Sequence, residues 1–320
     1  MRLGVFRPGF PQTADRVGLP VSGYGRDIEG RHTLGLQASA GVIGVVYNVD
    51  DPAGKGVADH LRRVFRCRET RRSGSIASWV IEEVDAVLVG FREDVIYFDF
   101  LDDVLPEANS YVVLSLHRAS SGIKSLTVHH TGNPTAAAEA GGRPRELSIA
   151  NPSLTYSILS NLSRLASEGL PGFEVVYEVT HHGPTNLEKP LTFVEIGSSE
   201  SEWRLKRAHA VVGDAVADAL INVKLPPNCT PTVGFGGPHY AEGFTKRALS
   251  LGECYGHIIS RYAIKELSTS EGELREVSRL AVLRSNPPAV KAVIAKMGAI
   301  PRSSILDVLK SLGIQHEITG

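Results

Sequence analysis

Histidine residues flanked by glycine and hydroxyl residues recur along this chain where apolar stretches end. The stretch 174–203, EVVYEVTHHGPTNLEKPLTFVEIGSSESEW, has His181 and His182 after one apolar segment and Glu195 near the end of another. The same combination recurs at 125–133 (SLTVHHTGN), 234–247 (GFGGPHYAEGFTKR) and 254–260 (CYGHIIS). A single histidine at a strand end is usually a structural residue, although imidazole is also a common ligand and base. Recurrence in four segments indicates a site for acid, base or metal chemistry.

These segments supply imidazole and carboxylate groups that support two kinds of chemistry. The candidate groups are His117, His129, Glu178, His181, His182, Glu195, His239 and His257. Three converging groups would bind Zn²⁺ with an open position, lowering the pKa of a bound water to about 7 and polarising an ester carbonyl. Without a metal, the same groups could act as general base and oxyanion partner. If the strand continues through His181 and His182, the two rings point to opposite sides, and at most one is a ligand.

A series of strands and helices must position these groups. Apolar runs and alternation predict strands over 40–48, 111–116, 125–129, 174–180, 191–196 and 232–235. Asn151 and Pro152 are typical of a helix start, and Ser199 with Glu202 forms a capping box that opens a long helix. A last helix is predicted over about 302–312. Polar strand ends followed by helix starts are the usual active-site positions of α/β sheets.

Composition narrows the class of protein. The chain has 320 residues, 42% hydrophobic and 22% charged, with a formal net charge of -1, which suits one large α/β core. The near-neutral charge argues against a general nucleic-acid binder but allows a local basic patch. Three cysteines, Cys67, Cys229 and Cys254, are too few for a disulfide framework and suggest a reducing interior. No apolar run predicts a membrane span or a signal peptide, so we expect a cytoplasmic protein.

The first forty residues differ in composition from the rest. Residues 1–40 are rich in glycine and proline without a sustained apolar period, which predicts a poorly ordered extension before a single α/β domain at 41–320. Six arginines then occur between positions 62 and 72, in and after a helix predicted over 53–66. They form either a solvated helix face or a phosphate-binding patch, because arginine matches phosphate oxygens well.

The common catalytic signatures are missing from the sequence. HExxH, GxSxG, Walker A and paired CxxC motifs do not occur. A serine hydrolase is therefore not the first choice, and no nucleotide cofactor is expected.

Six motifs, in this order, resemble those of the archaeal and plant type of D-aminoacyl-tRNA deacylase. They are HRASSG (117–122), SLTVHHTGN (125–133), EVTHHGPT (178–185), FVEIGSSESEW (193–203), GFGGPHYAEGFTKR (234–247) and GHIIS (256–260). The resemblance covers about residues 41–320. It implies zinc-dependent hydrolysis of the ester between a D-amino acid and the 3′-terminal adenosine of tRNA. It also implies an α/β fold, with a mixed central sheet and helices on both faces, similar to peptidyl-tRNA hydrolase and nucleoside phosphorylases.

The resemblance suggests roles for particular residues. The expected catalytic residues are His129, Glu178, His181, His182, Glu195 and His239. Of these, His129, His181, Glu195 and His239 are the expected zinc ligands, and Glu178 is expected to hold the α-ammonium group of the substrate. The expected substrate contacts are His117, Ser120, Thr127, Asn133, Thr185, Ser198, Gly236, Gly237, Tyr240 and His257. The candidates for tRNA phosphates are Arg62, Arg63, Arg66, Lys246 and Arg247.

Two other readings of the sequence stay open at this point. A metal-dependent peptidase or amidase could use the same scaffold, because fold does not fix function. A non-enzymatic RNA-binding protein could use the arginine run and a structural metal. The resemblance favours D-aminoacyl-tRNA as partner, with no stable protein partner and no membrane.

Overall fold

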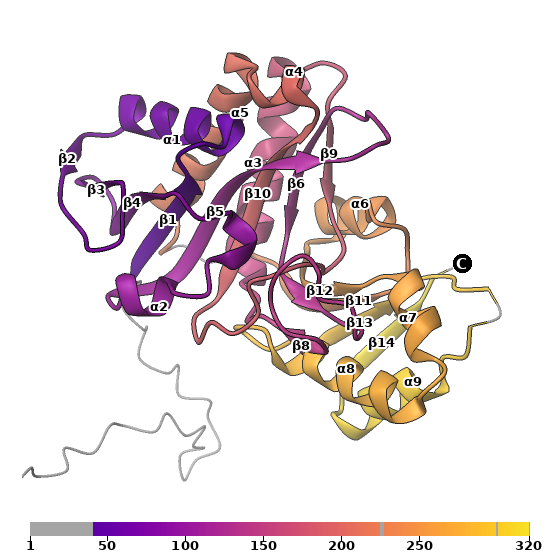
Figure 1. The fold of residues 1–320 in the computed structure, drawn as a ribbon. Helices are drawn as coiled ribbons and strands as arrows, with labels where there is room; N and C mark the ends of the chain where they lie inside the picture. Colours follow the sequence, from indigo (N-terminus) through magenta and orange to yellow (C-terminus); the bar gives the residue numbers. More distant parts are fainter. Residues whose placement is uncertain (1–40, 225–226, 299, 320) are drawn as a thin grey trace, which may run out of the picture. The chain divides into compact units, whose positions relative to one another are not determined.

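The computed structural model describes residues 41–224, 227–298 and 300–319. The extension expected at 1–40 lies outside the described residues. An eight-stranded sheet, of order β2-β3-β4-β1-β5-β10-β6-β9, forms the larger part of the described structure (Figure 1). Its strands are β1 (Val42–Asn48), β2 (Cys67–Glu69), β3 (Ala77–Ile81), β4 (Ala86–Phe91), β5 (Ala108–Arg118), β6 (Ser125–His129), β9 (Glu174–Tyr177) and β10 (Leu191–Ser198).

This sheet is mixed. β4, β1, β5 and β10 run parallel, whereas β6 is antiparallel to β10 and parallel to β9. Helices α1 (Pro52–Val64), α3 (Pro152–Gly169) and α5 (Lys206–Ile221) share an apolar core with one face. The short helices η1 (Val95–Tyr97) and α2 (Leu101–Val104) adjoin the core on the other face. The predicted α/β fold, with a mixed sheet and helices on both faces, is confirmed.

Local signals explain where α1 begins and how closely it packs. The Asp51 side chain accepts hydrogen bonds from the backbone N–H groups of Ala53 and Gly54, which satisfies two of the free donors of the first turn. A Cβ on Gly54 would lie only 2.4 Å from the carbonyl oxygen of Leu114, so glycine allows the helix to lie directly against β5. The N-terminus of α1 is thereby fixed beside the carboxyl ends of β1 and β5.

A second sheet is built from the C-terminal part of the chain. Its four parallel strands, in the order β12-β11-β13-β14, are β11 (Thr230–Phe235), β12 (Glu253–Ile259), β13 (Lys291–Ile294) and β14 (Gln315–Ile318). Helices α7 (Arg261–Leu267), α8 (Glu271–Leu283) and α9 (Ser303–Ser311) share one apolar cluster with it. Helix α6 (Glu242–Leu251) packs against β12 and joins the core of the larger sheet.

Within the described ranges, no helix is both long and apolar enough to cross a membrane. Two short strands, β7 (Gly132–Asn133) and β8 (Glu146–Leu147), pair with each other.

Two sequence-based expectations need correction here. Cys229 and Cys254 form a disulfide, with Cα atoms 5.6 Å apart, so the expectation that the cysteines stay reduced is wrong for this pair. The reason is the pairing of β11 with β12, which brings together two segments that are 25 residues apart in sequence. The long helix predicted after Ser199 is divided into α4 (Glu200–Trp203) and α5, although the capping box of Ser199 and Glu202 is present.

Candidate active site

A cavity of about 690 Å³ opens at the carboxyl ends of β1, β5 and β10. This is the edge of a parallel sheet where α/β proteins usually place ligands. Its polar lining includes His117, His181, His182, Glu195 and His239. These five residues were all among the sequence-based candidates, and the fold brings them together from four segments of the chain.

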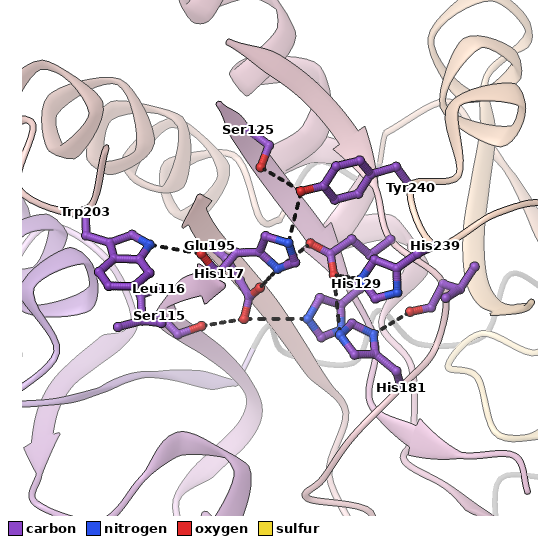
Figure 2. A network of polar contacts seen from close by, with 12 residues as sticks. Ser115, Leu116, His117, Ser125, His129, His181, Glu195, Trp203, His239 and Tyr240 are labelled. Carbon is purple, nitrogen blue, oxygen red and sulfur yellow. Dashed lines mark hydrogen bonds and ion pairs between the residues drawn. The ribbon is translucent and has the colours of Figure 1, made fainter. Parts of the chain in front are cut away.

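Strand register brings Glu195 together with two histidines, of which His117 lines the cavity and His129 is buried behind it. Glu195 of β10 pairs with Ser115 of β5, and Gly197 pairs with His117. The Ser115 hydroxyl donates to Glu195 Oε1 at 2.7 Å, and His117 Nδ1 donates to Glu195 Oε2 at 3.2 Å. On the other side, His129 Nε2 lies 3.7 Å from Glu195 Oε1. Figure 2 shows these groups converging from adjacent strands.

Gly197 makes room for the His117 ring. A Cβ at this position would lie 2.8 Å from a ring carbon of His117 and 2.9 Å from Ser125 Oγ, both buried. The close approach of the imidazole to β10 therefore depends on glycine here. The sequence analysis did not single out Gly197, Ser115 or Ser125. A serine inside the apolar run YVVLSL was the available signal for Ser115.

The pairing of Glu195 with His117 determines the protonation state of both buried side chains. Burial alone would raise the pKa of Glu195, but the hydrogen bond from His117 and the nearby imidazoles of His117 and His129 outweigh it and hold that pKa well below its usual range. Burial alone would lower the pKa of His117, but the hydrogen bond to Glu195 and the charge of Glu178 raise it above its usual value. The site is therefore an ionised carboxylate beside an imidazole that holds its proton.

Glu178 lies beneath the imidazoles instead of in the cavity wall. It is 1% exposed and follows β9, where its backbone N–H donates to Val128 O. Its carboxylate is close to three imidazoles, at 3.1 Å from His117 Nδ1, 3.0 Å from His239 Nε2 and 3.3 Å from His181 Nε2. Burial would raise the pKa of Glu178, but the hydrogen bond from His239 and the nearby histidines lower it. This placement differs from the expected contact with a substrate ammonium group and suits a residue that positions histidines.

Three histidines converge next to this carboxylate pair. One ring nitrogen from each of His129, His181 and His182 lies within 4.8 Å of the other two. The Nδ1 atoms lie near backbone carbonyls, at 3.4 Å from His130 O, 2.8 Å from Val179 O and 2.7 Å from Gly183 O respectively. If each Nδ1–H donates to its carbonyl, each Nε2 keeps a free lone pair, and this is how metal-binding histidines are usually oriented. Burial and neighbouring imidazoles lower the pKa of His181 well below its usual range and that of His182 to about 4, which favours neutral rings at these two positions. Burial alone would lower the pKa of His129 as well, but Glu195 and Glu178 raise it above its usual value, so His129 must release a proton before it can bind a metal.

The condition under which His181 and His182 would point to opposite sides, a strand that continues through both, is not met. Strand β9 ends at Tyr177, four residues before His181, so strand alternation no longer applies. His182 adopts a left-handed backbone conformation with φ of 43°, and both rings turn toward His129, with centroids 4.4 and 4.9 Å from it. Both members of the pair are therefore available as ligands.

The donor set fits a metal ion on chemical grounds. His129 Nε2 and Glu178 Oε1 are buried and make no hydrogen bond to any other described residue. Besides the three histidines, two further groupings have metal-like spacing: His117, Glu178 and His239, and His129, Glu178 and Glu195. Each of the four expected ligands, His129, His181, Glu195 and His239, belongs to at least one of these groupings, but the four do not occur together in one grouping.

A hydroxyl relay extends the cluster on the side of His117. The Tyr240 hydroxyl lies 3.0 Å from His117 Nε2 and 3.4 Å from Ser125 Oγ (Figure 2). The indole N–H of Trp203 donates to the carbonyl oxygen of His117 at 2.9 Å. Tyr240, expected as a substrate contact, thus contacts His117 directly. Both ring nitrogens of His117 therefore have polar partners, Glu195 at Nδ1 and Tyr240 at Nε2.

The remaining candidates for substrate contact fall into three groups. Thr127 and Ser198 are buried on β6 and β10, where their hydroxyls make no hydrogen bond to described residues. Asn133 donates to Gly141 O, and Thr185 donates to Glu146, so these two support the loop 134–146. Ser120 is exposed beyond β5, and Gly236 and Gly237 form a positive-φ turn after β11.

His257 belongs to a different network. It is fully buried, with Nε2 3.0 Å from both Ser148 O and Arg284 O and Nδ1 3.0 Å from the Thr180 hydroxyl. Burial lowers the pKa of His257 to about 4, although its backbone hydrogen bonds oppose the shift. This imidazole is structural in the observed fold.

A pH-dependent stability follows from His257. The folded state keeps the ring neutral down to about pH 4, whereas the unfolded chain protonates it near pH 6.5, so stability is full above that value and falls as pH decreases. We expect this residue to contribute about 2 kcal/mol of the stability lost between pH 8 and pH 5. Urea unfolding of the wild type and of His257→Gln at both pH values measures it. An equal loss in the two proteins would contradict the assignment.

The arginine and lysine residues expected to contact tRNA phosphates differ in their surroundings. The Arg62 guanidinium lies 4.1 Å from the centre of the Trp79 ring, and Arg66 pairs with Glu83 at 3.1 Å. Arg247 binds Glu253 and Glu317, which occupies most of its donors. Lys246 is exposed on α6. Their contact with tRNA stays a prediction, and Arg63 is considered below.

Fold and site together define an α/β protein whose buried histidine and carboxylate cluster is suited to activating water. Comparison with known proteins specifies the family. The sequence profile described as D-aminoacyl-tRNA deacylase matches residues 104–317. A protein of this name from Desulfurococcus amylolyticus is 43% identical over 258 residues, covering 80% of this chain and 92% of its own. The one from Staphylothermus marinus is 42% identical over 262 residues, covering 80% and 91%.

A solved structure supports the same assignment of fold. The crystal structure of a conserved protein of unknown function is similar to this chain, with a TM-score of 0.79 and 27% identity. The similarity covers 87% of this chain and 95% of that one. The chain belongs to the D-aminoacyl-tRNA deacylase family, which confirms the resemblance found in the sequence.

Proposed function

We propose that this protein hydrolyses the ester bond of D-aminoacyl-tRNA, releasing free tRNA and the D-amino acid, and that it uses Zn²⁺ held by His129, His181 and His182. The observation that supports it is the convergence of these three imidazoles beside Glu195: His181, His182 and Glu195 line the cavity, and His129 is buried next to them. Three histidines with an open fourth position are a common catalytic zinc site. When bound, Zn²⁺ would lower the pKa of a water molecule and polarise the ester carbonyl.

The residues of the chain supply the proton transfers. Glu195 lines the cavity and is ionised, so it accepts a proton as water attacks the ester carbonyl carbon. His117 holds a proton and donates it to the ribose oxygen as the carbon–oxygen bond breaks. The hydrogen bond of 3.2 Å between them then returns the proton from Glu195 to His117. Tyr240 and Glu178 position His117 during this cycle.

The cavity rim offers other carboxylates for the substrate ammonium group. Asp50 and Asp94 line the cavity and are exposed, unlike the buried Glu178. In this proposal they accept the α-ammonium group of the D-amino acid. An L-amino acid that keeps the ester in place would lose this contact or meet the cavity wall. Each tenfold preference for the D form requires about 1.4 kcal/mol of such discrimination.

Parallel assays with D-tyrosyl-tRNA and L-tyrosyl-tRNA test the proposal. We expect rapid release of D-tyrosine only, lost after chelation and restored by Zn²⁺. D-selective hydrolysis that survives thorough chelation would retain the deacylase function and refute the metal. No hydrolysis of the D ester with any metal would refute the function itself.

A further inference from the structure

A second cavity, of about 480 Å³, lies between α1 and the α4–α5 segment. Lys55, Asp59 and Arg63 of α1 line one side, and Arg204, Lys206 and His209 line the other. We call this cavity the basic groove. The two walls belong to helices that pack against each other on the same face of the larger sheet (Figure 1).

The floor of the basic groove is a built feature of the fold. A Cβ at Gly56 would lie 2.2 Å from the His209 ring, so only glycine lets this imidazole lie on the surface of α1. His209 Nε2 also lies 2.7 Å from Trp203 O, which fixes the ring at the junction of α4 and α5. The distance between the two walls is therefore set by packing.

The charge of the basic groove is positive and partly unneutralised. Four exposed cationic side chains line it against a single carboxylate. Lys55 pairs with Asp59 at 2.7 Å, and Arg204 pairs with Glu200 at 2.8 Å. Among the described residues, no carboxylate lies within 4.0 Å of the Arg63 or Lys206 cations. These two facing cations are available to bind an anion.

The basic groove and the catalytic cavity lie on either side of the start of α1. Asp51 lines the catalytic cavity, and the next residue, Pro52, lines the groove. Arg118 also lines the catalytic cavity, and its guanidinium carbon lies 5.3 Å from the centre of the ring of Trp203, the neighbour of Arg204. From Pro52 to Arg63 the groove follows α1 for about 16 Å, which is long enough for several phosphates of a strand.

We propose that the basic groove binds the sugar–phosphate backbone of the acceptor end of tRNA as it leaves the catalytic cavity. This inference rests on the proposed function and adds the path of the RNA. Arg118 contacts the phosphates nearest the ester, and Arg63 and Lys206 contact those further along the strand. An extended polyanion matches a charged groove that lies next to the catalytic cavity, whereas a single small anion would leave most of the length of the groove unused.

The test compares a long and a short substrate. Arg63→Gln with Lys206→Gln removes the two unpaired cations, both of which are exposed. We expect the KM for D-tyrosyl-tRNA to rise about tenfold at 0.1 M salt with kcat unchanged, and the salt slope of log(kcat/KM) to decrease by about 1.4. The ester 3′-O-D-tyrosyl-adenosine has no phosphate, so its kcat/KM should not change.

A charge-matched control and two contrary outcomes complete the test. Arg275→Gln with Arg279→Gln removes two charges from α8, and the KM for tRNA should not change. An unchanged KM in the groove variant, or an equal loss of activity on the adenosine ester, would overturn the inference.

If the wild type cleaves neither ester, the proposed function fails. Filter binding of uncharged tRNA to the two double variants then tests the groove by itself: weaker binding by the groove variant alone supports it, and equal binding overturns it.

Discussion

Replacing Glu195 with glutamine is expected to reduce kcat on D-tyrosyl-tRNA by about 10² to 10⁴ while the protein stays folded. The amide has the same shape and can still accept the Ser115 hydroxyl, which lies 2.7 Å from the carboxylate in the wild type. It cannot take a proton from the attacking water. Single-turnover kinetics at saturating enzyme measure the chemical step, and circular dichroism reports folding.

The pH dependence of activity is also expected to change in Glu195→Gln. The charge of Glu195 helps to raise the pKa of His117, so its removal lowers that pKa. Because the reaction needs protonated His117, activity is lost as pH rises through this pKa. The alkaline limb of the variant should therefore move to lower pH. Glu174→Gln, an exposed change on β9, is the matched control and should leave rate and profile unchanged.

A modest loss would change the assignment of roles. If Glu195→Gln retains more than a tenth of the wild-type kcat, Glu195 does not take the proton. The carboxylate would then act only by orienting His117 and His129, whose rings lie 3.2 and 3.7 Å from it.

Local signals in the sequence were sufficient for the starts of helices α3 and α4. The Asn151 side chain accepts from the Leu154 N–H, and the capping box at Ser199 is present, as the spacing predicted. Both depend on residues three positions apart, so no knowledge of the tertiary structure was needed. Strands β5, β6 and β10 could likewise be predicted from runs of apolar residues that are neighbours in the sequence.

The site required strand order, which local patterns do not contain. Ser115 and Glu195 are 80 residues apart and meet only because β5 and β10 are neighbours in register. The antiparallel direction of β6, which brings His129 to the same carboxylate, has no sequence signature of its own. The disulfide of Cys229 and Cys254 and the basic groove were missed for the same reason.

The pair His181 and His182 shows a different limit. The preceding strand ends at Tyr177, three residues earlier than predicted, and the backbone then takes a left-handed turn at a residue that is not glycine. Left-handed conformations are uncommon for such residues and are maintained where the surroundings over-determine them. The alternation of side chains along a strand does not continue through such a turn, and the proposed ligand set therefore contains both histidines of the pair instead of one.

Replacing His182 with alanine is therefore the sharpest test of that ligand set. With one of three imidazole ligands removed, we expect bound zinc to fall at least tenfold and kcat to fall by about a thousandfold. Zinc content is measured by atomic absorption after dialysis, independently of activity. His316→Ala removes an exposed histidine from β14 and should change neither quantity.

The result also distinguishes His182 from the alternative groupings of donors. If His182→Ala keeps its zinc, the metal is held by His117, Glu178 and His239 or by His129, Glu178 and Glu195, neither of which contains His182. Glu178→Gln then separates the explanations, because Glu178 occurs in both alternatives and is absent from the histidine triad. Loss of zinc in His182→Ala, with zinc retained in Glu178→Gln, would identify the three imidazoles as the ligands and leave Glu178 with its role of positioning His117 and His239.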